Sequence, residues 1–121
     1  MSLVLVIEDT LTDREVLATC LRRSGLEVLT CISSEEALEK LRSLRPDAIV
    51  LDVVLPGVSG FELCRELKSE PTTAQIPVVL CSTKGTDMDR FWGLRQGADA
   101  YLAKPVDQEE LVRTVKSVLR K

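Results

Sequence analysis

Five polar or charged positions that follow apolar runs could together carry out phosphoryl chemistry. They are Glu8, Asp9, Asp52, Ser82 and Lys104. Carboxylates gathered in one place repel one another and resist ionisation unless a cation neutralises them. A hard divalent ion such as Mg²⁺ prefers oxygen ligands and is typically held by one or two carboxylates plus a phosphate oxygen. The set therefore predicts metal-binding acids, an acceptor carboxylate, a hydroxyl donor and a cationic group around one phosphoryl site.

Of these five residues, Asp52 is the one that a purely structural role explains least well. It lies between the apolar runs 49–51 and 53–55, where an unpaired charge is costly to bury. Its structural alternative is a solvated acid at the end of a strand. The other acids could complement a helix N-terminus, the serine could cap a helix, and the lysine could be a surface residue. Pro105 favours extended backbone at Lys104, which would let the ammonium group reach an anion held at Asp52.

Strands and helices are predicted to alternate along the chain and to position these residues. Short aliphatic runs indicate buried strands, and apolar residues at helical spacing after capping residues indicate helices. The predicted strands are 3–7, 27–32, a run within 47–55, 76–81 and 99–103. Five helices are predicted. The first starts at a cap on Thr12 or Asp13 and stops at Gly25, and the second spans 33 to about 44. The third begins at 59, the fourth spans 87–96 before Gly97, and the fifth begins at 107.

This alternation predicts an α/β fold with a doubly wound, five-stranded parallel sheet and five helices. Helical crossovers between parallel strands are right-handed and must cover both faces of the sheet. Ligands bind such sheets outside the carboxyl ends of the strands. The polar residues that end the predicted strands are therefore expected to line a functional crevice.

Length and composition narrow the function further. The 121 residues suit one domain, expected to span 1–121. The chain has no histidine, which excludes histidine-based catalysis and histidine zinc sites. A net charge of −3 and 3% aromatic residues argue against direct nucleic-acid binding. The spacing of Cys20, Cys31, Cys64 and Cys81 suits reduced, buried thiols. With no long apolar run, we expect a cytoplasmic protein without membrane contact.

In order and spacing, the five positions and Pro105 resemble a two-component response regulator receiver domain of the CheY type, over essentially the whole chain. Residues 51–60 look like the phosphoacceptor strand and loop of a receiver, and residues 97–105 look like its final switch segment. The resemblance implies a flavodoxin-like sheet in the order 2-1-3-4-5. It also implies a phosphoacceptor that assists its own phosphorylation and dephosphorylation, and not a conventional enzyme.

The resemblance further implies roles for the acids. Asp52 would accept a phosphoryl group from a histidine kinase or phosphotransfer domain. Glu8, Asp9 and Asp52 would hold Mg²⁺, with Mn²⁺ as the alternative, together with the backbone carbonyl of Val54.

The resemblance also implies roles for four residues of the last two predicted strands and their ends. Ser82, Thr83 and Lys104 would bind phosphoryl oxygens or take part in the switch, and the Lys104-Pro105 peptide is the expected cis bond. Tyr101 would be the aromatic residue that moves inward when Ser82 is drawn to the phosphate.

Segments 14–17, 60–65 and 91–101 more narrowly resemble single-domain PilH or PixH type regulators of pilus-driven motility and phototaxis. The expectation is a stand-alone receiver without an output domain, a monomer or weak homodimer. Its downstream protein partner would bind the face made by 87–96, 99–103 and the last helix, around Arg90, Leu94 and Tyr101.

Two departures from the receiver pattern predict a long-lived phosphoryl group. Val54 replaces a residue that is often polar, and Thr83 is bulkier than the alanine or glycine often found there. Two other classes of function remain open. One is a receiver used as an unphosphorylated scaffold or as a phosphate sink in another phosphorelay. The other is a metal-dependent phosphatase or hydrolase, which would normally need additional substrate-binding elements.

Overall fold

Five parallel strands form one sheet in the order β2-β1-β3-β4-β5, which confirms the predicted doubly wound fold. The structure is a computed structural model that describes residues 2–120. Its strands are β1 (Leu3–Ile7), β2 (Glu27–Cys31), β3 (Ala48–Asp52), β4 (Val78–Ser82) and β5 (Ala100–Ala103). Its helices are α1 (Leu11–Arg23), α2 (Ser34–Lys40), α3 (Gly60–Ser69), α4 (Asp87–Arg95) and α5 (Gln108–Leu119).

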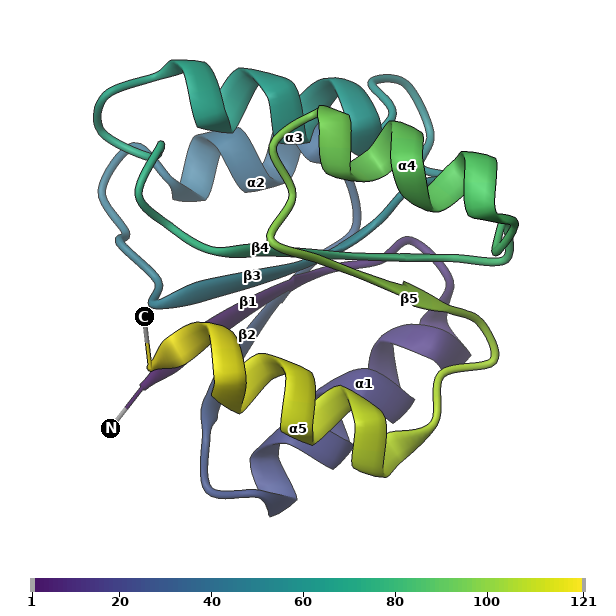
Figure 1. Ribbon diagram of the computed structural model, residues 1–121. Helices are drawn as coiled ribbons and strands as arrows, with labels where there is room; N and C mark the ends of the chain where they lie inside the picture. Colours follow the sequence, from purple (N-terminus) through teal and green to yellow (C-terminus); the bar gives the residue numbers. More distant parts are fainter. Residues whose placement is uncertain (1, 121) are drawn as a thin grey trace.

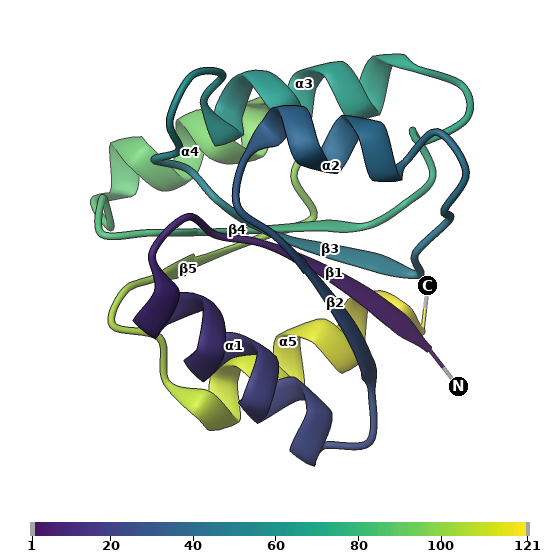
Figure 2. The ribbon, with the colours of Figure 1, turned by 180° about the vertical axis from the view of Figure 1, so that it is seen from behind.

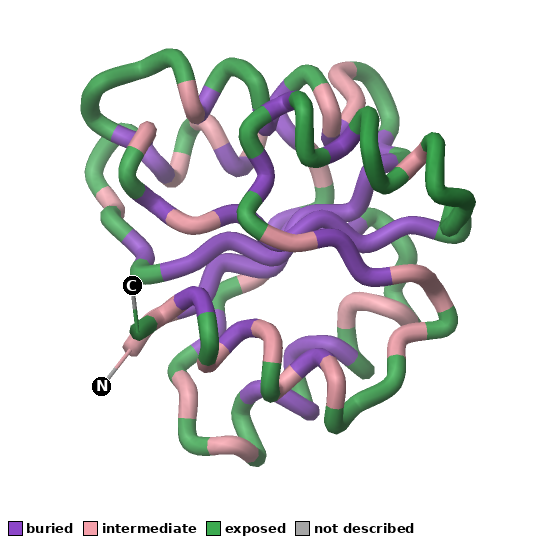
Figure 3. Tube along the Cα trace, in the orientation of Figure 1, coloured by how far each residue is buried: buried purple, intermediate pink, exposed green. Residues whose placement is uncertain are grey.

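The sheet separates two hydrophobic cores. Helices α1 and α5 cover one face, and α2, α3 and α4 cover the other (Figure 1); the view from behind shows the same two layers (Figure 2). Alternate strand residues point to opposite faces. Leu5 and Ile7 therefore belong to the core under α2 and α3, whereas Val4 and Val6 belong to the core over α1. The central strands β1, β3 and β4 are buried along almost their whole length (Figure 3), as expected for a parallel sheet covered on both sides, whereas the edge strand β2 has exposed residues.

Helix α2 is shorter than predicted, because it ends at Lys40 instead of continuing to about residue 44. The Arg45 guanidinium donates hydrogen bonds to the carbonyls of Leu41 and Leu44, the latter at 2.8 Å. Arg45 also precedes Pro46, and a residue before proline disfavours the helical conformation. The side chain of Arg45 therefore satisfies the carbonyls that a longer helix would have used.

Two other predicted boundaries were wrong. Strand β4 begins at Val78 and not at residue 76, because Pro77 has no N–H to donate and the Ile76 carbonyl accepts a hydrogen bond from Lys68 Nζ at 2.8 Å. Helix α1 begins after Thr10, so neither Thr12 nor Asp13 caps it. The carboxylate of Asp13 contacts Lys104 instead.

Candidate functional site

The carboxyl ends of β1, β3 and β5 bring Glu8, Asp52 and Lys104 together. Lys104 Nζ donates a hydrogen bond to Glu8 Oε1 and lies 3.5 Å from Asp52 Oδ2. Residues two apart along a strand point to the same face of the sheet. Glu8 and Asp52 therefore point to the same side as Val6 and Val50, which is the side covered by α1. The three groups therefore meet above the N-terminal part of α1.

Asp52 is held in place by contacts at both of its oxygens. Its side chain is buried, and Oδ1 accepts a hydrogen bond from the backbone N–H of Val54 at 3.2 Å. The backbone behind it is tightly packed, because a Cβ on Gly60 would collide with the carbonyl oxygen of Asp52. Glycine at the start of α3 thus permits the helix to approach the end of β3. The close packing fixes the position from which Asp52 faces the crevice.

Glu8 is fully buried, and its environment disfavours its charge. Burial raises the pKa of Glu8 to about 7, and the nearby Asp52 carboxylate adds to the rise. The hydrogen bond from Lys104 and the N–H of Thr10, 3.2 Å from Oε2, oppose it. Burial alone would lower the pKa of Lys104, but the contacts with Glu8, Asp13 and Asp52 outweigh it and raise the pKa. The lysine therefore stays protonated and balances part of the acidic charge.

Glu8, Asp9 and Asp52 form a group suited to a hard cation. Carboxylate oxygens from the three residues lie within 4.8 Å of one another, and Asp9 is exposed. The loop that carries two of them is braced by Arg14, whose guanidinium donates to the backbone carbonyls of Glu8 at 3.1 Å and Asp9 at 3.3 Å. Donors that are all oxygen atoms fit Mg²⁺ or Mn²⁺ better than a softer metal.

A pocket of about 260 Å³ opens beside Asp9 and Asp52. Val54 and Thr83, both exposed, form part of its wall. The side chain of Val54 gives this wall an apolar surface next to the acceptor. The residues that line the pocket are Asp9, Thr10, Asp13, Asp52, Val54, Thr83 and Lys104.

Ser82 and Tyr101 lie on the opposite side of the sheet from this group. Ser82 is fully buried and does not line the pocket, and its Oγ accepts a hydrogen bond from the backbone N–H of Lys84 at 3.0 Å. Tyr101 belongs to the core under α2, α3 and α4 and donates its hydroxyl proton to the carbonyl of Lys84. Burial raises the pKa of the Tyr101 phenol, so it stays protonated and able to donate.

The structure thus groups most of the predicted site residues but divides them between two faces. The Lys104-Pro105 peptide is cis, as predicted. Tyr101 was expected to contribute to an exposed partner surface, yet its side chain is 5% exposed. Only Arg90 and Leu94 of that trio are exposed. The expected role of the Val54 carbonyl as a metal ligand stays a prediction.

Asp13, Arg14 and Lys84 are site residues that the sequence patterns did not identify as such. Asp13 and Arg14 follow the acidic pair by about one helical turn, a spacing that could have indicated that they face the same loop. The part played by Lys84 lies in its backbone, and the identity of its side chain gives no signal for it.

The cysteines take no part in this chemistry. All four are free and buried, and burial raises the thiol pKa, to about 12 for Cys81. In residues 2–120 no helix has the length and apolar character needed to cross a membrane.

Comparison with known proteins identifies the family. Residues 4–116 match the response regulator receiver domain family. Protein PilH of Pseudomonas aeruginosa is 37% identical over 119 residues, which are 98% of each chain. The transcriptional regulatory protein AfsQ1 of Streptomyces coelicolor is 43% identical over the whole of this chain, which spans 52% of that relative.

Solved structures agree with this result. A putative response regulator from Chloroflexus aurantiacus superimposes with a TM-score of 0.96 at 37% identity, covering 99% of this chain and 98% of the other. The chemotaxis response regulator CheY4 of Vibrio cholerae gives 0.91 at 30% identity, covering 98% of each. Fold, acidic group and sequence all lead to one assignment: the chain belongs to the response regulator receiver domain family, whose members are phosphoacceptors and not conventional enzymes.

Proposed function

We propose that Asp52 accepts a phosphoryl group from a histidine kinase or phosphotransfer domain in a Mg²⁺-dependent reaction. The observation that supports this most directly is the position of Asp52, which lines a pocket between an acidic pair and a lysine. An acceptor, a group of cation ligands and a positive group for phosphoryl oxygens are the parts that such a transfer needs.

In the proposed reaction an Asp52 carboxylate oxygen forms a bond to phosphorus. The phosphorus–nitrogen bond of the donor phosphohistidine breaks, its electron pair stays on the imidazole nitrogen, and that nitrogen takes up a proton from solvent. The hydrogen bond from the Val54 N–H holds one Asp52 oxygen, which leaves the other to react. Lys104 lies 3.5 Å from that second oxygen and can neutralise charge on the incoming group.

Glu8, Asp9 and Asp52 would hold the Mg²⁺. When bound, the ion supplies positive charge that neutralises the crowded acids and the phosphoryl oxygens. The buried Glu8 is the residue whose ionisation this charge would favour most, because burial raises its pKa. Mn²⁺, which takes the same oxygen ligands, is the alternative ion.

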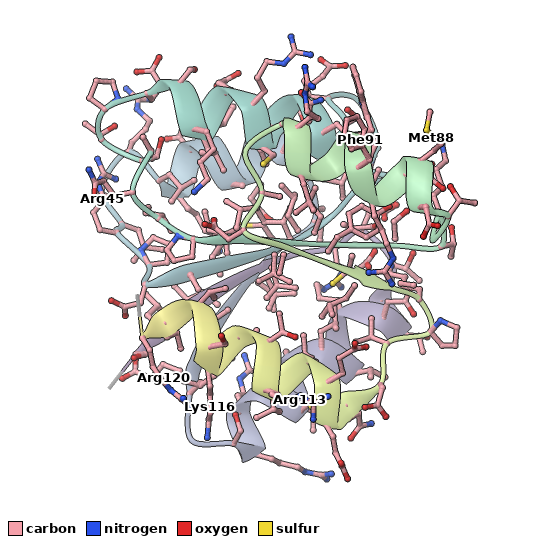
Figure 4. The ribbon with its side chains drawn as sticks, in the orientation of Figure 1. Arg45, Met88, Phe91, Arg113, Lys116 and Arg120 are labelled. Atoms are coloured by element: carbon pink, nitrogen blue, oxygen red, sulfur yellow. The ribbon has the colours of Figure 1, made fainter. Side chains whose placement is uncertain are left out.

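The phosphorylated domain would signal through Ser82, Tyr101 and the face formed by α4, β5 and α5. Helix α4 buries one residue, Gly93, and leaves most of its surface exposed. Met88 is 76% exposed and Phe91 57% exposed, and both project outward from α4 (Figure 4). An exposed apolar surface of this kind is typical of a protein–protein contact. A downstream protein partner, or a second copy in a weak homodimer, would bind here.

We further propose that this receiver acts in the cytoplasm, in a chemotaxis-like pathway for pilus motility or phototaxis. The match to PilH supports it, because it covers 98% of both chains.

Acetyl phosphate with Mg²⁺ tests the acceptor. The intact protein should gain the mass of one phosphate, whereas Asp52→Asn should gain none, because a neutral amide cannot attack phosphorus. Asp87→Asn, which neutralises an exposed acid on α4, is the control and should label normally. Labelling that survives Asp52→Asn would refute the assignment. If the protein consumed many molecules of acetyl phosphate without retaining phosphate, the phosphatase alternative would be supported. If it stayed folded but unlabelled, the scaffold alternative would be supported.

A further inference from the structure

Asp13 is an acid in the first turn of α1 that the phosphoacceptor chemistry leaves without a role. Its Oδ2 accepts a hydrogen bond from Lys104 Nζ at 3.1 Å, whereas Asp52 Oδ2 lies 3.5 Å from the same nitrogen. Both carboxylates line the same pocket. The lysine that should serve the phosphoryl group is thus nearer to an acid on α1 than to the acceptor.

The fold directs Asp13 toward the lysine. Leu17 follows it by one helical turn and is buried in the core between α1 and the sheet. Residues four apart lie on the same face of a helix, so Asp13 faces the end of the sheet where Lys104 follows β5. The Asp13 side chain is 46% exposed, which places it at the mouth of the pocket, while Glu8 is fully buried.

We propose that Asp13 is a positioning residue that holds the Lys104 ammonium group in the resting domain and releases it when Asp52 is phosphorylated. This inference rests on the proposed function. An ammonium group has three donors, and the hydrogen bonds to Glu8 and Asp13 occupy two of them. The third donor faces Asp52, whose Oδ2 lies 3.5 Å away, so a phosphoryl group that takes more than one hydrogen bond from Lys104 competes with Asp13 for the second.

Breaking the contact of Lys104 with Asp13 costs less free energy than breaking its contact with Glu8. Water can hydrate the half-exposed carboxylate of Asp13 after the lysine departs, whereas the buried carboxylate of Glu8 would be left without solvent. The contact with Asp13 therefore stabilises the resting arrangement without preventing the switch. Removing its charge should shift the balance toward the arrangement in which Lys104 contacts the phosphoryl group.

The test measures binding of beryllofluoride, a phosphoryl mimic that is not transferred, at saturating Mg²⁺ and by fluorine NMR. Asp13→Asn should bind it about fivefold more tightly than the unmodified protein. Asp13→Glu, which keeps the charge, should stay within about twofold. The control Glu15→Gln removes an exposed charge from the same helix and should have no effect. Thermal unfolding of each variant checks that it is folded.

A double-variant cycle separates an effect through Lys104 from a general effect of charge. In a Lys104→Ala background, Asp13→Asn should no longer tighten binding. Three outcomes would each overturn the inference. They are tighter beryllofluoride binding that persists in the Lys104→Ala background, an equal gain in affinity in Glu15→Gln, and no gain in affinity in Asp13→Asn. If the unmodified protein bound no beryllofluoride and took up no phosphate, the proposed function itself would fail; binding that Asp13→Asn leaves unchanged refutes only the role of Asp13.

Discussion

The hydroxyl groups of Ser82 and Tyr101 are joined through the backbone of a single residue. Ser82 Oγ accepts a hydrogen bond from the N–H of Lys84, and the carbonyl of Lys84 accepts one from the Tyr101 hydroxyl. If Ser82 turns toward a phosphoryl group it must give up the first bond, because the phosphoryl site lies across the sheet. Lys84 is then free to move, and Tyr101 loses a fixed acceptor. This relay offers a physical route from Asp52 to α4.

Tyr101→Phe tests the relay by removing one hydroxyl group and keeping the ring. Losing a hydrogen bond worth about 1 kcal/mol should make backbone amides of residues 84–86 exchange with solvent about fivefold faster in the unphosphorylated protein. With beryllofluoride bound, the variant and the unmodified protein should exchange alike there. Amides of α5 serve as the internal control. A difference of the same size in both states would show that the hydroxyl group has no part in the switch.

Gly93 of α4 packs directly against the ring of Tyr101. A Cβ on Gly93 would lie 2.7 Å from Tyr101 Cδ2 and 3.1 Å from Leu80 Cδ1. Gly93→Ala should therefore lower the free energy of unfolding by about 1 to 2 kcal/mol, although alanine favours helix. In a Tyr101→Ala background the same change should instead raise it by about 0.8 kcal/mol. Denaturant unfolding measures both, and the same sign in the two backgrounds would contradict this account of the packing.

Much of this architecture could be predicted from the sequence, because its signals are local. Apolar runs and capping residues gave the order and type of each described element. The contact between Asp13 and Lys104 spans 91 residues, so no local pattern encodes it. The position of Ser82 across the sheet follows from strand alternation, but only once the end of β4 is known. The shortened α2 depends on the side chain of Arg45, which a count of apolar residues ignores.

The raised pKa of Glu8 predicts a stability that depends on pH. Burial raises this pKa to about 7 from its ordinary value of 4.5, so between these values the folded protein binds more protons than the unfolded chain. Its contribution to stability is complete below pH 4.5 and is lost as pH rises through 7. Without metal, the free energy of unfolding should thus fall by about 2 kcal/mol across this range.

Glu8→Gln is the control, because the amide does not titrate. Its free energy of unfolding, from urea titrations in a metal chelator, should fall less between pH 4.5 and 7 than that of the unmodified protein. Saturating Mg²⁺ should reduce the fall in the unmodified protein, because the ion favours the ionised carboxylate. Parallel pH profiles for the two proteins would mean that folding does not raise the pKa of Glu8.

Val54 should make the phosphoryl group on Asp52 long-lived. Hydrolysis needs a water molecule aligned opposite the aspartyl oxygen, and polar side chains commonly orient such water. The side chain of Val54 is 54% exposed at the pocket that holds Asp52, with Thr83 on the same wall. An isopropyl group there offers water no hydrogen-bond partner. Val54→Asn restores a donor and an acceptor at similar volume and should speed loss of phosphate about tenfold, equivalent to about 1.4 kcal/mol of barrier.

The decay of phosphorylated protein, followed after removal of the donor at constant Mg²⁺, measures this effect. Leu29→Asn is the matched control, because Leu29 is an apolar residue 41% exposed on β2 and does not line the pocket. Its decay should equal that of the unmodified protein. If Val54→Asn decays no faster, then access to the pocket or the arrangement of the acids, and not water orientation at this position, sets the lifetime. Replacing Thr83 with alanine would then distinguish these two, because a faster decay in that variant would assign the limit to access.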